Sequence, residues 1–252
     1  MTKSTKFEEE RTRAMPLQAE QEPAIPDIDF TGQIFCEKYI IISELSKGGM
    51  GLIFKAEQIA LKREVAIKVI HTNNNDDATN RFLLEASLTA SLKHPNIVSI
   101  YDFGRTSDGM LFLVMELING ENLQNHVKTH GPLSILETIE VSQQMCSALS
   151  VAHNKNIVHR DIKPSNIVIS KLPGGKLSAK LIDFGLVKHI NEQNEFTQAG
   201  TLLGSPMYMS PEQIKATGVD DRTDIYSLGL TMFYALTGSK PFVARGINSL
   251  MH

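Results

Sequence analysis

The most informative part of this sequence reads His159-Arg160-Asp161-Ile162-Lys163-Pro164-Ser165-Asn166, and Asp183-Phe184-Gly185 follows it after one predicted hairpin. Turns in the chain can bring together two carboxylates, an amide oxygen and a lysine ammonium from these two segments. Such a group offers a proton acceptor, hard oxygen ligands that suit Mg²⁺, and a positive charge for a phosphoryl group in transfer. A polar loop without chemistry is the alternative interpretation, but the flanking strands and both spacings favour a phosphoryl-transfer site.

Two weaker motifs lie earlier in the chain, on predicted strands of one small sheet. The first is a glycine-rich turn, Leu45-Ser46-Lys47-Gly48-Gly49-Met50-Gly51-Leu52-Ile53, whose backbone could approach phosphate oxygens because glycine lacks Cβ. Taken alone, such a turn is more often only a tight hairpin.

The second motif is Val65-Ala66-Ile67-Lys68, in which strand alternation places Ala66 and Lys68 on one face. A lysine that closes a strand is usually solvated, but Glu85 on the next predicted helix could hold Lys68 and direct its charge at phosphates.

The spacing of apolar residues predicts a strand-rich first half and a helix-rich second half. Strands are expected at residues 39–45, 52–56, 64–70, 97–103 and 111–116, with one helix near residues 80–91. Farther along, Ile135, Ile139, Cys146 and Leu149 fall on one predicted helix face. Residues 224–237 are apolar nearly all round, which predicts a helix buried in the core of the second half. Residues 171–176 are typical of a hairpin turn between strands at 167–169 and 180–182.

The composition is that of an ordinary globular protein. The chain has 252 residues, of which 42% are hydrophobic and 21% charged, so it is long enough for one large domain or two lobes. Residues 1–33 carry seven acidic and four basic side chains and three prolines, and we expect them to be a disordered acidic leader. The remaining residues hold 21 basic and 21 acidic side chains, which argues against a nucleic-acid partner.

The cysteines and the apolar runs of the sequence indicate in which cell compartment the protein is expected. The sequence has two cysteines, Cys36 and Cys146, which lie too far apart to form a metal-ligand pair and fit a reducing compartment. No apolar run approaches the roughly 18 residues needed to cross a bilayer, and the N-terminus is charged where a signal peptide would be apolar. We therefore expect a cytoplasmic protein without a membrane segment in this chain.

Together the motifs resemble those of protein kinases, and in particular the eukaryotic-like serine/threonine protein kinases of bacteria. The resemblance runs from about residue 39 to residue 242, which is most of the chain. Lys163, two residues after Asp161, is typical of the Ser/Thr branch of the family and not of the tyrosine branch. The segments similar to the bacterial subgroup are Gly49-Met50-Gly51 and Met207-Tyr208-Met209-Ser210-Pro211-Glu212-Gln213.

The resemblance implies an α+β bilobal fold. A small, mainly antiparallel β lobe with one helix would span residues 34–118, and a larger, mainly helical lobe would span residues 119–252. ATP and Mg²⁺ would be the cofactors, and the γ-phosphoryl group of ATP would pass to serine or threonine hydroxyls of proteins in signalling. One alternative is a catalytically impaired kinase-like module that binds a nucleotide or a partner. Phosphorylation of a small molecule is a third interpretation, which Ser210-Pro211-Glu212 disfavours because in the family this segment helps to seat a peptide.

The family roles of the catalytic residues carry over to matching positions of this sequence. The resemblance implies that Asp161 orients the acceptor hydroxyl and takes its proton, and that Lys163 stabilises the phosphoryl group in transfer. It also implies that Asn166 and Asp183 hold Mg²⁺.

The resemblance further implies a nucleotide site in the first lobe and the linker. Lys68 would contact the α- and β-phosphates under restraint from Glu85. The phosphate loop would comprise Leu45, Ser46, Gly48, Gly49, Met50 and Gly51. The adenine would lie between the apolar residues Ile53, Ala66 and Val168 and against the linker positions Met115, Glu116 and Ile118. For these apolar positions, core packing explains the sequence as well as ligand contact does.

Regulation is implied by Arg160, because an arginine before the catalytic aspartate often makes the family's catalytic loop sensitive to phosphate on the activation segment. That segment would be residues 183–212. We expect autophosphorylation of Thr197, Thr201 or both, with self-association of two copies, so that the added charge pairs with Arg160. Inert surface threonines are the alternative.

Three features depart from the family pattern. Ser46 stands where the first glycine of the phosphate loop would be, although later glycines remain. Ser205 replaces the usual threonine and keeps the hydroxyl that would bond the catalytic loop. The chain stops at His252, whereas the family's large lobe continues into helices that carry an arginine partner for Glu212. We therefore expect an incomplete large lobe, truncated at its C-terminus, in which Glu212 lacks that partner.

Overall fold

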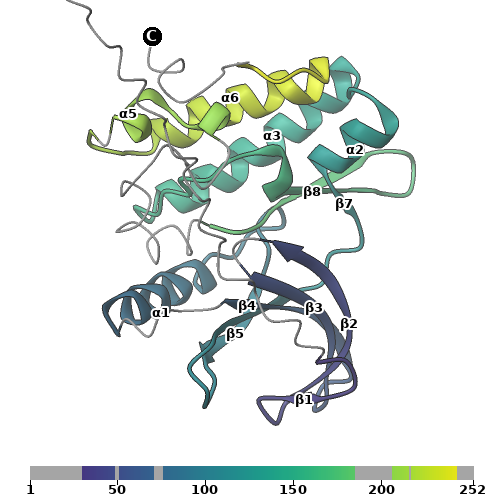
Figure 1. Ribbon diagram of the computed structural model, residues 1–252. Helices are drawn as coiled ribbons and strands as arrows, with labels where there is room; N and C mark the ends of the chain where they lie inside the picture. Colours follow the sequence, from purple (N-terminus) through teal and green to yellow (C-terminus); the bar gives the residue numbers. More distant parts are fainter. Residues whose placement is uncertain (1–29, 49–50, 71–75, 185–205, 216, 243–252) are drawn as a thin grey trace, which may run out of the picture.

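The computed structural model describes residues 30–48, 51–70, 76–184, 206–215 and 217–242, which form a strand-rich lobe and a helix-rich lobe (Figure 1). This arrangement confirms the predicted α+β bilobal architecture. The predicted acidic leader lies almost wholly outside the described residues, as do the residues after 242. The lobe boundary between residues 118 and 119 stays a prediction.

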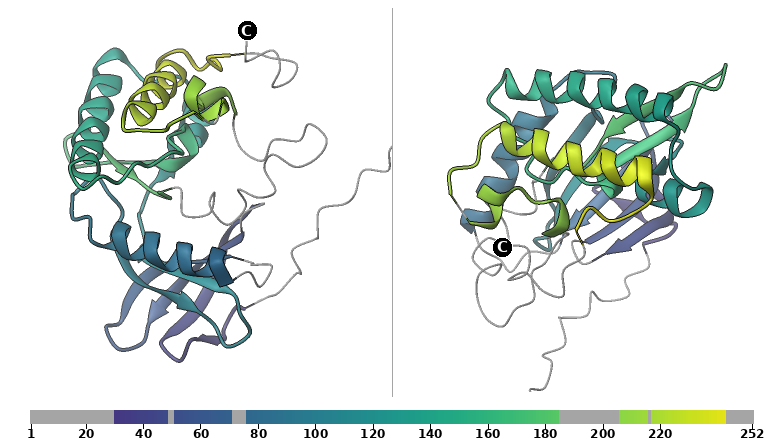
Figure 2. Two further views of the ribbon diagram at one scale, coloured as in Figure 1. Left: turned by 90° about the vertical axis from the view of Figure 1, so that its left-hand side faces the viewer. Right: turned by 90° about the horizontal axis from the view of Figure 1, so that it is seen from above.

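An antiparallel sheet forms most of the strand-rich lobe. Its strands, in the order β1-β2-β3-β4-β6-β5, are β1 (Ile34–Phe35), β2 (Tyr39–Gly48), β3 (Gly51–Gln58), β4 (Arg63–Ile70), β6 (Leu111–Glu116) and β5 (Ile100–Arg105). Helix α1 (Asp76–Ala90) lies against one face of the sheet (Figure 2). Alternation along β4 divides its side chains between two cores. Val65 and Ile67 pack with β2 and β3, whereas Ala66 packs with Phe82 and Ala86 of α1.

The described part of the helix-rich lobe is built around a second, smaller sheet, three longer helices and the short helix α5. The sheet has the order β7-β8-β9, with β7 (Glu121–Asn122), β8 (Ile167–Lys171) and β9 (Leu177–Leu181). The helices are α2 (Leu123–His130), α3 (Ile135–His153), α5 (Pro211–Ile214) and α6 (Arg222–Thr237), with short 3-10 turns at Pro164–Asn166 and Pro206–Tyr208. Side chains at the helix starts satisfy backbone N–H groups there, such as Asn122 before α2 and the Ser134–Glu137 capping box of α3.

The predicted strand at residues 97–103 begins only at Ile100, and the reason lies in the other lobe. The backbone N–H of Val98 donates to the carbonyl of Leu181 at 3.0 Å, and the N–H of Leu181 donates to the carbonyl of Asn96 at 2.8 Å. Residues 96–98 therefore pair with the end of β9, and contact with the large sheet begins at Ser99, whose carbonyl accepts from the N–H of Glu116 at 2.9 Å. The predicted hairpin at residues 171–176 is present, although β9 begins at Leu177, earlier than predicted.

The helix face that apolar spacing grouped in the sequence is not the buried face of α3. Ile135, Ile139 and Cys146 are exposed, and of the predicted set only Leu149 is buried. The buried apolar residues are Val141, Met145, Ala148, Leu149 and Ala152. Hydrogen bonds fix this rotation, because the amide of Gln144 accepts from the N–H of Ala179 at 2.8 Å and donates to the carbonyl of Leu177 at 2.9 Å. The face of α3 that carries Gln144 is thereby held against β9.

The prediction that α6 is buried all round is also wrong. Its buried face is largely polar and consists of Thr223, Asp224, Ser227, Leu228, Thr231, Tyr234 and Ala235. Ile225, Phe233 and Leu236 are exposed. Hydropathy alone could not identify this face, because Thr223 and Asp224 have hydrogen-bond partners in other segments of the chain.

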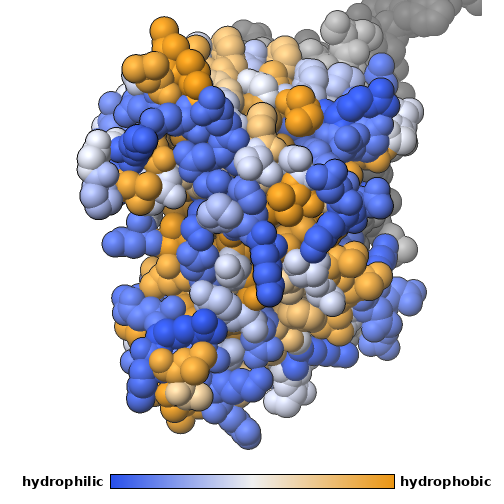
Figure 3. Space-filling view, turned by 180° about the vertical axis from the view of Figure 1, so that it is seen from behind, coloured by the Kyte–Doolittle hydropathy of each residue, from blue (hydrophilic) through white to orange (hydrophobic). Residues whose placement is uncertain are grey.

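The surface carries apolar side chains in separate patches among polar ones on the face seen in Figure 3. Isolated apolar patches of this kind are normal for globular proteins. Among the residues that the structure describes, no helix combines the length and the apolar character that crossing a membrane requires.

The rotation of α3 gives a stability prediction. Replacement of Met145 by alanine removes a side chain that is 1% exposed, and should lower the free energy of unfolding by about 2–5 kcal/mol. Replacement of Ile135, which is 68% exposed on the same helix, should change that free energy by no more than about 0.5 kcal/mol. Urea unfolding followed by circular dichroism measures both. Equal losses for the two variants would contradict the observed orientation of the helix.

Candidate active site

A loop between α3 and β8 brings three of the predicted catalytic side chains into contact. The Nζ of Lys163 lies 2.8 Å from Oδ2 of Asp161. The side-chain N–H₂ of Asn166 donates to the same Oδ2 at 2.9 Å and to the backbone carbonyl of Asp161 at 2.8 Å. Since both donations come from the amide nitrogen, the amide oxygen of Asn166 is left as the acceptor atom of this side chain. The carboxylate of Asp161 is therefore held in one orientation by two neighbours.

His159 connects this loop with the end of β9 through both nitrogens of a neutral imidazole. Its Nδ1 accepts from the backbone N–H of Asp161 at 3.2 Å, and its Nε2 lies 3.0 Å from the carbonyl oxygen of Ile182. A backbone N–H can only donate and a carbonyl can only accept, so the proton sits on Nε2. The ring is fully buried, and burial lowers the pKa of His159. The neutral form that this geometry needs is thus also the form that burial favours.

Asp224 of α6 holds the backbone of the loop. Its carboxylate is completely buried and accepts from the N–H of His159 at 2.8 Å and from the N–H of Arg160 at 2.8 Å. The ring of His153 lies 2.8 Å from the same carboxylate. Arg160 has φ of 63°, a left-handed conformation that an arginine seldom adopts without such restraint. The sequence motifs did not identify Asp224 as a residue of the site. An acidic residue in a largely apolar helix was the signal that could have indicated a buried role for it.

Lys68 joins the two lobes. Its Nζ lies 2.8 Å from Oδ1 of Asp183, and the lysine side chain is 8% exposed. Lys68 lies on the same face of β4 as Ala66, as predicted, and is buried and not solvated. Glu85 is half-buried on α1, and its predicted pairing with Lys68 stays a prediction. Because one partner belongs to β4 and the other follows β9, the ion pair fixes the position of the lobes relative to each other.

Asn166 and Asp183 are neighbours across the small sheet. Strands β8 and β9 pair Ile167 with Leu181, and the N–H of Ile182 donates to the carbonyl of Asn166 at 2.9 Å. The register therefore places the two predicted Mg²⁺ ligands at the same end of the hairpin. Their donor atoms, an amide oxygen and a carboxylate, are hard oxygens of the kind that Mg²⁺ prefers, so the residues fit the ion. Asp183 has φ of 54°, a second strained residue at this site.

Most of the predicted adenine contacts lie in one apolar cluster. Ile53, Ala66, Met115 and Ile118 all belong to the core that the sheet forms with α1. Val168 is half-buried on β8. Packing accounts for these positions whether or not a nucleotide binds, so their contact with adenine stays a prediction.

The linker residue Glu116 has a partner of its own. Both of its carboxylate oxygens lie 2.7 Å from Nζ of Lys180 on β9. This ion pair connects the end of β6, in the strand-rich lobe, with the small sheet of the helix-rich lobe. Backbone contact between the linker and the adenine stays a prediction.

The structure describes the strands on both sides of the glycine-rich turn, up to Gly48 and from Gly51. Leu45 is 49% exposed, Ser46 pairs with Ile53, and Gly48 pairs with Gly51. A Cβ at Gly51 would meet the carbonyl oxygen of Val69 at 2.1 Å. The close approach of two strands therefore requires this glycine independently of any ligand.

Several predicted positions lie outside the described residues, namely Gly49, Met50, Thr197, Thr201 and Ser205. Glu212, which we expected to lack its partner, accepts from the hydroxyl of Thr223 at 2.8 Å. Its own backbone N–H and that hydroxyl lower the pKa of the carboxyl. The expected lack of an arginine partner for Glu212 stays a prediction, and Thr223 is the partner that the structure gives this carboxylate.

Most of the chain is similar to one known protein family. The family described as "Protein kinase domain" matches residues 39–252. A relative named serine/threonine-protein kinase pkn3, from Myxococcus xanthus, is 37% identical over 86% of this chain and 41% of its own length. Serine/threonine-protein kinase PrkC from Bacillus subtilis is 39% identical over 84% of this chain and 32% of its own length. The chain thus spans less than half the length of these relatives.

A solved structure shares the arrangement. The structure of Rad53 residues 1–466 in complex with AMP-PNP matches with a TM-score of 0.69 and 27% sequence identity, over 85% of this chain and 52% of that one. The protein kinase fold predicted from the motifs is confirmed by this match and by the observed strand order.

The Asp224 contacts give a prediction. Asp224→Asn replaces one of two accepting oxygens by an amide group that faces backbone N–H donors, and should lower the free energy of unfolding by about 2–3 kcal/mol. Asp220→Asn, whose carboxylate makes an exposed ion pair with Arg222 two residues away, is the matched control and should leave stability nearly unchanged. Urea unfolding of both variants is the measurement. If Asp224→Asn is as stable as wild type, Asp224 does not hold the loop.

Proposed function

The chain belongs to the protein kinase family, and on that premise we propose that it transfers the γ-phosphoryl group of ATP to serine and threonine hydroxyls of proteins. One observation carries the proposal: the ion pair between the buried Lys68 and the half-buried Asp183 lies beside the contacts among Asp161, Lys163 and Asn166. A buried ammonium is costly unless it is paired, and Asp183 pairs this one. In a protein kinase the same positive charge contacts the nucleotide phosphates.

Asp161 is positioned to act on the acceptor hydroxyl. Asn166 and Lys163 hold its carboxylate, so that a bound hydroxyl would meet it without loss of side-chain freedom. The carboxylate orients the hydroxyl and receives its proton as the hydroxyl oxygen bonds to the γ-phosphorus and the bond from that phosphorus to the β–γ bridging oxygen breaks, which releases ADP. Lys163, beside it, offers a positive charge to the oxygens of the phosphoryl group in transfer. Lysine at this position supports serine or threonine as the acceptor.

Lys68 and the metal ligands act on the nucleotide. The ammonium of Lys68 compensates charge on the phosphates of ATP and is already fixed by Asp183. The oxygens of Asn166 and Asp183 would hold Mg²⁺, which when bound neutralises charge on the β- and γ-phosphates. The protein needs no covalent intermediate, because positioning and charge compensation lower the barrier.

A protein acceptor is supported by the segment around α5. The amide of Gln213 donates to the carbonyl of Arg160 at 2.8 Å, and Ser210, which is fully buried, caps α5. The catalytic loop and the segment that in the family seats a peptide are therefore directly connected. The names of the relatives, serine/threonine-protein kinases, agree with a protein as acceptor.

The proposal predicts which substitutions abolish transfer. Lys68→Met and Asp183→Asn should each lower the rate of phosphoryl transfer at least about a hundredfold, because each removes fixed charge compensation. Lys55→Met is the matched control: Lys55 lies on the neighbouring strand β3 and pairs with Glu64 at 2.6 Å, so its loss should leave the rate within about twofold of wild type. Labelled ATP, Mg²⁺ and a generic basic protein provide the assay.

Folding of each variant is checked by circular dichroism before the assay. Wild-type rates for both variants would refute the assigned roles. Nucleotide binding by the wild type without any transfer would instead favour the kinase-like binding module.

We further propose that the chain phosphorylates its own activation segment through contact between two copies. The support is Arg160, whose backbone is fixed by Asp224 and Gln213 next to Asp161. A phosphate on the segment would supply an anion to this guanidinium. The proposed acceptors, Thr197 and Thr201, lie outside the described residues.

Mass spectrometry tests the self-phosphorylation. After incubation with ATP and Mg²⁺, the wild-type chain should carry phosphate on Thr197, Thr201 or both, at a rate that rises with chain concentration because two copies must meet. Asp161→Asn, which lacks the proton acceptor, should remain unmodified and is the control. An active wild-type chain with neither threonine modified would contradict this part of the proposal.

A further inference from the structure

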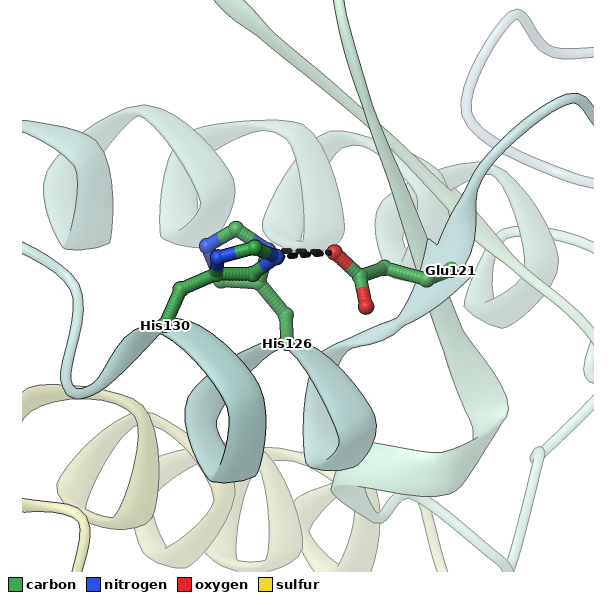
Figure 4. A group of neighbouring side chains, drawn as sticks. All are labelled: Glu121, His126 and His130. Carbon is green, nitrogen blue, oxygen red and sulfur yellow. Dashed lines mark hydrogen bonds and ion pairs between the residues drawn. The ribbon is translucent and has the colours of Figure 1, made fainter.

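Away from the catalytic loop, three side chains that commonly bind metals converge at the start of the helix-rich lobe. They are Glu121 on β7 and His126 and His130 on α2, and they point toward one another (Figure 4). Oε1 of Glu121 lies 2.9 Å from Nδ1 of His126 and 3.2 Å from Nε2 of His130. One ligand atom from each residue lies within 4.8 Å of the other two. The catalytic roles described above use none of these residues.

The geometry points to a binding site for a divalent transition-metal ion, with Zn²⁺ as the probe, and we propose Glu121, His126 and His130 as its ligands. With bonds of about 2.0–2.2 Å, neighbouring ligand atoms of a tetrahedral zinc site lie about 3.3 Å apart. The two carboxylate-to-imidazole distances are close to that value, so only a small outward shift would admit the ion. Two histidines and one carboxylate are a donor set that zinc uses in proteins.

Rigid elements hold the three ligands. His126 and His130 are one helical turn apart on α2, which places both rings on one face with centroids 4.7 Å apart. Glu121 is fixed because β7 pairs Glu121 with Ile169 of β8. Asn122, between strand and helix, caps α2 by accepting from the N–H of Asn125 at 2.8 Å. A site on fixed backbone loses little entropy when the ion binds.

The site has room for a further ligand. A cavity of about 360 Å³ is lined by Asn119, Gly120, Glu121, His126, His130, Ile169, Ser170, Lys171 and Leu177. Three protein ligands leave a fourth position of a tetrahedral ion for water, and the cavity offers space for it. The side chain of His126 is 12% exposed and that of His130 is 56% exposed, so the ion could enter from the side of His130.

Charge in the cluster suits a cation. Hydrogen bonding from His126 lowers the pKa of Glu121, which keeps the carboxylate ionised. Lys171 in the cavity wall is the cation that opposes binding. Both imidazoles now donate to one carboxylate oxygen; on metal binding each would give up that N–H and offer the lone pair of the same nitrogen.

The donor set separates this site from the one at Asn166 and Asp183. Imidazole suits zinc, copper, iron and nickel, whereas Mg²⁺ prefers oxygen ligands. Mg²⁺ should therefore not compete at the cluster. An ion here would tie α2 to β7, immediately after the linker between the lobes.

Zinc binding by the whole chain tests the proposal. After removal of metals with a chelator, Zn²⁺ is titrated in competition with a fluorescent zinc indicator, in the presence of millimolar Mg²⁺. The wild-type chain should show one site that His130→Gln and Glu121→Gln each weaken at least about tenfold. Both positions are partly exposed, so both variants should fold, and circular dichroism checks this. His94→Gln is the control, because His94 hydrogen bonds to Ser147 away from the cluster, and it should bind as the wild type does.

Two results would overturn the proposal. In one, the wild-type chain takes up no zinc at micromolar concentration, which would leave the cluster as a hydrogen-bonded group only. In the other, His130→Gln and Glu121→Gln bind zinc as tightly as His94→Gln does, which would place the bound ion on other side chains.

Discussion

The carboxylate of Asp224, which is fully buried, accepts hydrogen bonds from the backbone of His159 and Arg160 and contacts the ring of His153. A buried charge is expensive unless it is hydrogen bonded, and here two backbone amides and one imidazole contact the two carboxylate oxygens. The backbone amides would themselves be unsatisfied without it. The carboxylate on α6 and the backbone N–H groups of the catalytic loop therefore stabilise each other. The same hydrogen bonds hold Arg160 in its left-handed conformation.

A series of contacts connects the catalytic loop with the strand-rich lobe. The ring of His159 reaches the carbonyl of Ile182, and the N–H of Ile182 reaches the carbonyl of Asn166. Asp183, the next residue, then meets Lys68 of the strand-rich lobe at 2.8 Å. A series of side-chain and backbone contacts therefore connects the buried lysine with Asp224. Phosphoryl transfer needs its charges fixed in advance, and this series of contacts is how the chain fixes them.

Local patterns in the sequence predicted most strands of the large sheet, because alternation on a strand and the order of residues in a turn depend on near neighbours. Partners distant in the sequence were not predictable. Asp183 lies far from Lys68 in the chain, and the polar buried face of α6 exists because Asp224 and Thr223 find acceptors and donors in other segments. The wrong face of α3 has the same origin, since Gln144 is directed inward by β9.

The histidines show why chemistry cannot be assigned from residue type alone. The chain has eight. His159 is buried and both ring nitrogens already serve backbone groups, so it has no lone pair to offer a metal. His126 and His130 instead face one ionised carboxylate at the edge of a cavity, where each ring nitrogen can exchange a proton for an ion at little structural cost. Position in the fold therefore decides which imidazoles support the backbone and which are available as ligands.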